Sequence, residues 1–312
     1  MRVTAAFLCL EDIMNRKFRT AAVAALCTAV VGGGLAGCDG DSLENWDPLA
    51  SGTQKAEVAP FTGTKKFDVG GRSVNVSCSG RPVKGKPVIV LMLGAGDGLD
   101  KMAALQKTLS EGNRVCSYDR LGAGASDRPD RPQDFAGVGA TLTGVLDQVA
   151  GDGPVVLAGH SLGGLIAARY APDHQDRIKG LVLMDATPPT MGGDITRTIP
   201  ESATGPAAQL RAQNLAMFKG QNPEKLVITD GKVRSAGNVP VEVIKHGKQY
   251  LAALPGYGPR LEQAWAAGQR QWLALSSRSK LSTAAGSAHY IYVDQPDVVV
   301  KAVQGVAAQA AG

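Results

Sequence analysis

The chain has 312 residues, of which 44% are apolar and 20% are charged, enough for the core of one large domain or of two small ones. The formal net charge is +5, but residues 1–37 hold four basic and two acidic side chains, so the remainder carries only 5 − 2 = +3. Because no run of Lys or Arg stands out and only 5% of residues are aromatic, a nucleic-acid partner is not expected.

The N-terminal segment has the pattern of a secretory signal. From Met14 it reads MNRKFRTAAVAALCTAVVGGGLAGC, in which basic residues precede an apolar run at 21–31 and small residues follow. The run is too short to be typical of a membrane-spanning helix. Acidic residues are unusual in the basic part of a signal, so Glu11 and Asp12 indicate that the true start is Met14. Residues 1–37 are predicted to be a signal peptide.

Residues 35–38, Leu-Ala-Gly-Cys, resemble the lipobox of bacterial lipoproteins, in which the cysteine becomes the lipid-modified N-terminus. The resemblance implies export to the cell envelope and a lipid anchor on Cys38. The alternative is an ordinary cleaved signal, which would release the protein and leave Cys38 unmodified. Residues 38–62 are polar and small, as in a tether, and we expect one domain over residues 63–312.

The domain alternates short apolar runs with helical patterns. Two strands joined by a Gly-Gly turn are predicted over residues 67–80, FDVGGRSVNVSCSG. Further strands are predicted at 87–93, 114–119, 154–159, 180–185 and 241–245, and helices at 101–109, 137–149 and 162–170. Several strands are apolar on both faces, as in a covered parallel sheet, so the order predicts an α/β fold.

Residues 188–240 interrupt this alternation. They are rich in Pro, Gly, Thr and Asn and hold one amphipathic segment, 207–220. Because so long an interval inside a compact domain is usually functional, we expect a lid insertion at about 188–240.

Ser161 lies between an apolar strand and a helix in the sequence VVLAGHSLGGLIAARY. This is the context of a G-x-S-x-G nucleophile elbow, a turn so sharp that Gly159 and Gly163 are needed to avoid clashes. A helix N-terminus directly after Ser161 would favour developing negative charge. A plain Gly-Ser turn would not require a small residue on both sides.

Three motifs resemble the α/β-hydrolase superfamily over roughly residues 65–310. They are GHSLGG at 159–164, YDRLGAGASDRP from Tyr118 and SAHYIYVDQPDVV from Ser287. The nearest resemblance is to secreted bacterial serine hydrolases and esterases of the lipoprotein type. It implies an eight-stranded, mostly parallel sheet flanked by helices, with a lid insertion.

His289 is the catalytic base that the resemblance implies, since superfamily members have nucleophile, acid and histidine in that order. It would take the proton of Ser161 and return it to the leaving group. The other histidines are expected to have packing or surface roles: His160 beside the site, and His174 and His246 elsewhere.

The triad acid is less plain in the sequence. Most superfamily members supply it after the strand that follows the insertion, but residues 245–259 contain no Asp or Glu. Some branches place it after the preceding strand, where Asp185 stands. Asp185 is therefore the expected acid, Glu262 is the alternative, and a site without a recognisable acid is the third reading.

Two backbone amides are expected to form an oxyanion hole. The resemblance implies Leu162, directly after the nucleophile, and Ala95, in the loop where the family usually has His-Gly. The nearby GAGDG does not have the spacing of a dinucleotide-binding loop. No Cys/His cluster, HExxH motif or acidic calcium loop is present, so neither a metal nor a cofactor is implied.

Cys78 and Cys116 are the two cysteines left after Cys9 and Cys27, which fall in the signal, and Cys38. An even pair in an exported domain favours a disulfide. In the α/β-hydrolase sheet the second strand lies beside the fourth, so the resemblance implies that these two cysteines can meet. Two buried free thiols are the alternative.

The sequence therefore predicts a serine hydrolase of the esterase or lipase type, which cleaves an ester or related acyl bond of a small-molecule substrate through an acyl-enzyme on Ser161. An acyltransferase, amidase or lactonase would use the same triad. A lipid-anchored binding module without catalytic activity is the alternative from another class.

Overall fold

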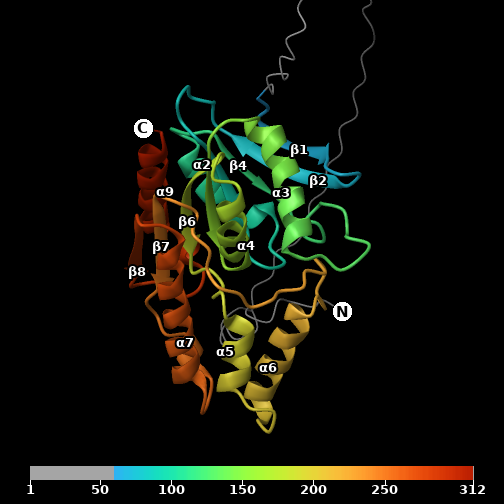
Figure 1. Ribbon diagram of the computed structural model, residues 1–312, viewed down its shortest axis with the longest axis vertical. Helices are drawn as coiled ribbons and strands as arrows, with labels where there is room; N and C mark the ends of the chain where they lie inside the picture. The colour runs from blue at the N-terminus through green and yellow to red at the C-terminus, as the bar shows by residue number, and fades with distance from the viewer. Residues whose placement is uncertain (1–59, 312) are drawn as a thin grey trace, which may run out of the picture.

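The structure is a computed structural model that describes residues 60–311 (Figure 1). The predicted signal peptide, the Met14 start, Cys38 and most of the predicted tether lie outside the described residues.

Within residues 60–311, eight strands form one sheet in the order β1-β2-β4-β3-β5-β6-β7-β8. Their bounds are β1 Gly63–Asp68, β2 Ser73–Ser79, β3 Val88–Met92, β4 Val115–Tyr118, β5 Val155–His160, β6 Ile178–Met184, β7 Val241–His246 and β8 Ser279–Ala284. β2 is antiparallel to β1 and β4, and all other neighbouring strands are parallel. This is the sheet that the resemblance implies.

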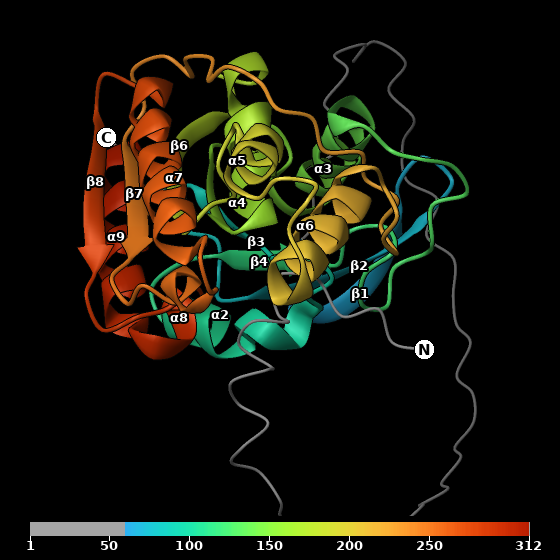
Figure 2. The ribbon, with the colours of Figure 1, turned by 90° about the horizontal axis from the view of Figure 1, so that it is seen from below.

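Helices cover both faces of the sheet (Figure 2). The covering helices are α2 Ala103–Leu109, α3 Phe135–Ala150, α4 Leu162–Tyr170 and α9 Pro296–Ala310. Alternate side chains of a strand point to opposite faces, so Val90 packs with α3 and α4 whereas Ile89 packs with α2 and α9. Within residues 60–311, no helix is long and apolar enough to span a membrane.

A third apolar cluster lies beyond the sheet, where Figure 1 shows α5, α6 and α7 together. α5 (Met191–Thr198) and α6 (Gly205–Phe218) belong to the 188–240 segment, and α7 (Gly258–Gln271) follows β7. Ile195, Leu210 and Trp265 bring the three helices into one cluster. The buried positions of α6, which include Leu210, Asn214 and Phe218, follow the spacing of the predicted amphipathic segment.

β1 begins four residues before the predicted strand pair, and the other predicted strands and helices are confirmed to within two residues at each end. No range was predicted for α5, α7, α8 (Ile291–Asp294), α9 or β8. The first turn of α5 is capped by Asp230, whose carboxylate accepts from the amides of Gly192 and Gly193 at 2.9 and 2.7 Å. So distant a cap is not visible in the local sequence. β8 is an edge strand with mostly half-exposed side chains, so it lacks a clear apolar alternation.

Cys78 and Cys116 form the predicted disulfide between β2 and β4. The two residues are directly paired in register, with their Cα atoms 4.1 Å apart, slightly below the usual range of roughly 4.4–6.8 Å. Both side chains are fully buried. The bridge ties the antiparallel edge of the sheet to its parallel centre, next to β3 and the loop that follows it.

Candidate active site

Ser161 occupies a strained turn between β5 and α4, with φ 50° and ψ −118°. A Cβ on Gly159 would lie 2.6 Å from the Gly163 carbonyl, and one on Gly163 would lie 2.3 Å from the carbonyl oxygen of Met92. Real Cβ atoms do not approach backbone so closely. The glycines on both sides of Ser161 are therefore required by close backbone contacts, as the elbow interpretation predicted.

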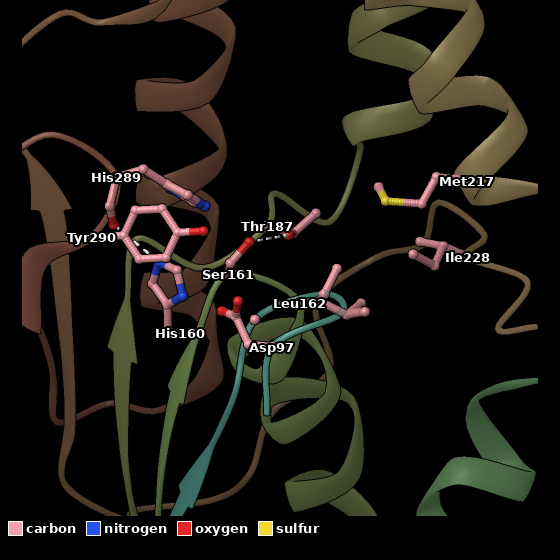
Figure 3. A pocket seen from close by; sticks show the side chains of 11 residues that line it. Asp97, His160, Ser161, Leu162, Thr187, Met217, Ile228, His289 and Tyr290 are labelled. Carbon is pink, nitrogen blue, oxygen red and sulfur yellow. Dashed lines mark hydrogen bonds between the residues drawn. The ribbon is translucent and has the colours of Figure 1, made fainter. Parts of the chain in front are cut away.

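His289 and Asp185 lie together beside this elbow. Nδ1 of His289 is 2.8 Å from Oδ2 of Asp185 and donates to it, because a carboxylate only accepts. Asp185 follows β6 directly and has a positive φ of 44°, which aspartate tolerates better than most residues. His289 and Ser161 line the same pocket, and Figure 3 shows the imidazole of His289 reaching toward the Ser161 hydroxyl.

Asp185 also accepts hydrogen bonds from two other directions. Its Oδ1 accepts from Nε1 of Trp265 at 2.8 Å, and both carboxylate oxygens lie 2.9 Å from Nδ1 of His246. Burial by itself would raise the pKa of Asp185, but the hydrogen bonds from His246 and His289 outweigh it and hold the pKa well below the usual range. Asp185 is therefore a carboxylate throughout the neutral range.

His246 is not the surface or simple packing residue that the sequence suggested. It is 5% exposed, and its Nε2 lies 2.8 Å from Oε2 of Glu262. Of the two candidate acids, Asp185 contacts His289, whereas Glu262 contacts His246. Sequence reasoning missed His246 because its partners lie 61 and 16 residues away, although a histidine stands close to where the family usually has its acid.

The other two histidines have the packing roles expected for them. Nε2 of His160 lies 3.0 Å from the carbonyl oxygen of His289, and burial and the charge of His289 lower the pKa of His160 to about 3. It is therefore neutral, and its Nε2 donates. His174 stacks on the ring of Tyr170 at 3.6 Å.

The pocket at Ser161 is small, with a volume of about 20 Å³. Ser161 is 8% exposed, and its hydroxyl lies 3.5 Å from that of Thr187. Met217 of α6 and Ile228 form an apolar wall opposite the elbow (Figure 3). Part of the 188–240 segment thus covers the serine.

The loop after β3 lines this pocket with Gly94 and Ala95, and Leu162 lines the same pocket. Within residues 60–311, the amides of Ala95 and Leu162 donate no hydrogen bond to another protein group. Leu162 is the first residue of α4, so its amide belongs to the free N–H groups of a helix start. The two expected oxyanion donors therefore border one pocket.

A buried ion pair braces this loop. Arg120 donates to the carbonyl oxygens of Leu93 and Gly94, both at 2.6 Å, and forms two hydrogen bonds to Glu224 at 2.7 and 2.8 Å. Glu224 in turn accepts from the amide of Gly96 at 2.9 Å. Arg120 stands in the motif from Tyr118, but its partner in the 188–240 segment gave no sequence signal.

Asp97 is a further pocket residue that sequence reasoning did not single out. Its carboxylate lines the pocket with Ser161, and the side chain is 4% exposed (Figure 3). Within the described part of the chain, no group donates a hydrogen bond to this carboxylate. Burial raises the pKa of Asp97, against the opposing charges of Lys101, Arg120 and His289. Within residues 60–311, no cluster of three or more His, Cys, Asp or Glu has the arrangement of a metal site.

Comparisons with known proteins support the fold of this chain. A family model described as "alpha/beta hydrolase fold" matches residues 87–219. The chain is 30% identical over 127 residues to the (lyso)-N-acylphosphatidylethanolamine lipase of Homo sapiens, a match that covers 40% of this chain and 36% of the lipase. It is 34% identical over 106 residues to the proline iminopeptidase of Saccharolobus solfataricus, which covers 32% of this chain and 34% of the peptidase. The matches thus span about a third of each relative.

Solved structures are similar over most of the described domain. The enol-lactonase from Burkholderia xenovorans LB400 has a TM-score of 0.55 at 20% identity and covers 78% of this chain and 99% of its own. A hydrolase from Pseudomonas aeruginosa PA01 has a TM-score of 0.56 at 20% identity, covering 78% and 97%. At this identity the likeness establishes the fold. The chain has the α/β-hydrolase fold, and the part of it over residues 87–219 matches the model of that family.

Proposed function

We propose that this protein is a serine hydrolase that cleaves an ester or a related acyl bond through a covalent acyl-enzyme on Ser161. The observation that carries the proposal is the convergence of three groups. Ser161 stands on an elbow that only small neighbours permit, His289 lines the same pocket, and Nδ1 of His289 donates to Asp185 at 2.8 Å. This is the combination of nucleophile, base and orienting acid that acyl transfer requires.

In the proposed reaction, His289 takes the proton of the Ser161 hydroxyl as its oxygen attacks the acyl carbon. The negative charge that develops on the carbonyl oxygen is stabilised by the amides of Ala95 and Leu162. His289 then gives the proton to the departing alcohol, and the acyl group remains on Ser161. Water, deprotonated by His289, releases the acid and restores the hydroxyl.

The substrate class rests on the pocket lining. Met217, Ile228 and Ala95 offer an apolar surface next to the serine, which favours an uncharged acyl chain. We therefore propose an ester with an uncharged acyl chain as substrate. The same residues would serve an amide, a lactone or acyl transfer to an alcohol.

The test is labelling by a fluorophosphonate together with hydrolysis of p-nitrophenyl esters of increasing chain length. Wild-type protein should be labelled and active. Ser161→Ala should lose both, with kcat lower by several orders of magnitude and the fold retained. Labelling of Ser161→Ala at the wild-type level would overturn the assignment of the nucleophile. A folded wild type without labelling or turnover would favour the binding module instead.

We also propose that the protein is exported and anchored to the membrane of the cell envelope by a lipid on Cys38. Support comes from the signal pattern and the lipobox resemblance at residues 35–38. Two acyl chains on one cysteine suffice for stable anchoring, whereas a single chain is marginal. Wild-type protein should partition into detergent and Cys38→Ala should not; wild-type protein found free in the medium would contradict the anchor.

A further inference from the structure

A second histidine and a second carboxylate lie in a row behind the proposed triad. His246 ends β7, the strand beside β6, which leads into Asp185. Its Nδ1 contacts both oxygens of Asp185 at 2.9 Å, and its Nε2 contacts Oε2 of Glu262 on α7 at 2.8 Å. Each of the three side chains is more than nine-tenths buried. Water therefore contributes little to satisfying these contacts.

The contacts determine where the protons lie. A carboxylate only accepts hydrogen bonds, so an imidazole between two carboxylates must donate from both ring nitrogens. An imidazole that donates from both nitrogens is an imidazolium. The row is thus carboxylate, imidazolium, carboxylate, and His289 donates to the same Asp185 carboxylate at 2.8 Å.

We propose that His246 and Glu262 are positioning residues of the triad: Glu262 keeps His246 an imidazolium, and this cation holds the Asp185 carboxylate ionised and oriented toward His289. The proposal rests on the proposed function, because it assigns the base to His289. It also accounts for the missing acid after β7. At the end of β7 stands His246 instead, and it donates to Asp185, the acid that follows the neighbouring strand β6.

Glu262 is held firmly enough for this role. Its Oε1 accepts from the amide of Leu251 at 2.7 Å, which leaves Oε2 directed at His246. In the absence of Glu262, Nε2 of the buried imidazolium would have no carboxylate partner. The pKa of His246 would then be lower, so its neutral form would appear at a lower pH.

The other titratable and charged groups around His246 do not replace Glu262. The ring of Tyr250 packs edge-on at 4.9 Å, Trp265 lies 6.2 Å away, and His289 lies across Asp185. Lys245 lines the pocket of about 220 Å³ that adjoins His246 and Glu262, and would disfavour a second cation there. This pocket also offers a route for proton exchange with water.

The proposal has a defined pH dependence. Burial alone would lower the pKa of His246, but the hydrogen bonds and charges of Asp185 and Glu262 raise it to about 9. The imidazolium is therefore present below this pH and is lost as the pH rises through about 9. Above it, one ring nitrogen has lost its proton, so one of the two carboxylates faces a lone pair and Asp185 no longer has a cationic partner. We expect kcat to fall there.

The test compares the pH profiles of kcat and KM for wild type, Glu262→Gln and Glu242→Gln on a p-nitrophenyl ester. Glu262→Gln keeps the shape and removes the charge, so the alkaline limb of kcat should move toward neutral pH by about one unit, with KM nearly unchanged. Glu242 lies on β7 and makes no hydrogen bond to His246, so Glu242→Gln controls for the loss of one negative charge. An unmoved alkaline limb in Glu262→Gln would overturn the proposal.

Two further measurements cover variants that fail to fold and failure of the proposed function. His246→Gln cannot ionise, so its alkaline limb near pH 9 should vanish. NMR titration of the His246 ring in the wild type needs no activity: the ring should be an imidazolium at neutral pH. A neutral His246 at neutral pH would refute the proposed imidazolium between Asp185 and Glu262, even in an active enzyme. A charged His246 in a protein that no fluorophosphonate labels would leave the row intact and refute the serine hydrolase.

Discussion

Asp97 is the one carboxylate in the described pocket lining, and no described group donates a hydrogen bond to it. A buried negative charge without a hydrogen bond is costly, which is why burial raises its pKa. The charge of such a carboxylate therefore affects which substrates bind in the pocket. A second negative charge in the substrate would be repelled, and an ammonium or hydroxyl group would supply the missing donor.

We therefore predict that the wild type discriminates against acyl chains that end in a carboxylate. The ratio of kcat/KM for p-nitrophenyl butyrate over p-nitrophenyl succinate should fall about tenfold in Asp97→Asn, the equivalent of roughly 1.4 kcal/mol. The discrimination should also weaken as pH falls, because protonation of Asp97 removes the charge. Asp100→Asn, an exposed neighbour outside the pocket lining, is the control. An unchanged ratio in Asp97→Asn would contradict the prediction.

At the scale of elements, the 188–240 segment is attached to the sheet by a buried charge pair. Arg120 follows β4 and holds the carbonyls of the loop after β3, while Glu224 holds both Arg120 and the amide of Gly96. The loop after β3 and the 188–240 segment are therefore held together by this pair. A movement of the segment that uncovers Ser161 has to break the Arg120–Glu224 contacts or leave the part of the segment around Glu224 in place.

Glu224→Gln should destabilise the fold by about 3–5 kcal/mol, because it leaves the buried Arg120 charge without its carboxylate. It should also lower kcat, since the Gly96 amide next to Ala95 loses its charged acceptor. Urea unfolding and initial rates measure the two effects. Asp173→Asn breaks an ion pair with Arg234 in which both side chains are more than half exposed, so it should show no measurable change. Equal stability of Glu224→Gln and wild type would argue against a stabilising role of the Arg120–Glu224 pair.

At the scale of the whole molecule, the disulfide joins the two parts of the mixed sheet. Cys78 lies on the antiparallel edge and Cys116 on β4, with 38 residues of sequence separation between them. The chain between them includes β3 and the loop that carries Ala95. The bridge thus restricts the conformations of the unfolded chain over the segment that carries Ala95, one of the two proposed oxyanion donors.

The double variant Cys78→Ala with Cys116→Ala should lose roughly 3–4 kcal/mol of stability on the chain-entropy account. Part of the loss comes from two small cavities where the sulfurs were buried. Urea unfolding of oxidised wild type, reduced wild type and the variant separates the two contributions, because reduction keeps the sulfur atoms. Unfolding of all three at the same urea concentration would show that the bridge does not contribute.

The sequence alone determined the elements whose signal is local. The elbow at Ser161 depends on glycines within two residues, and β3, β5 and β6 are short runs apolar on both faces. The bridge between Cys78 and Cys116 was predictable from cysteine parity together with the strand order that the α/β-hydrolase resemblance implies. These features are readable because each depends on neighbours in the chain or on the regular order of a sheet.

Only the tertiary structure decided which charged groups meet. His289 and Asp185 are 104 residues apart, as are Arg120 and Glu224, and His246 reaches Asp185 across 61 residues. In sequence, Asp185 and Glu262 were both acceptable acids, and His246 carried no functional signal. A carboxylate or an imidazole that is buried without a partner is costly, and the packing of β6, β7 and α7 determines which partner lies within reach of Asp185 and which lies within reach of Glu262.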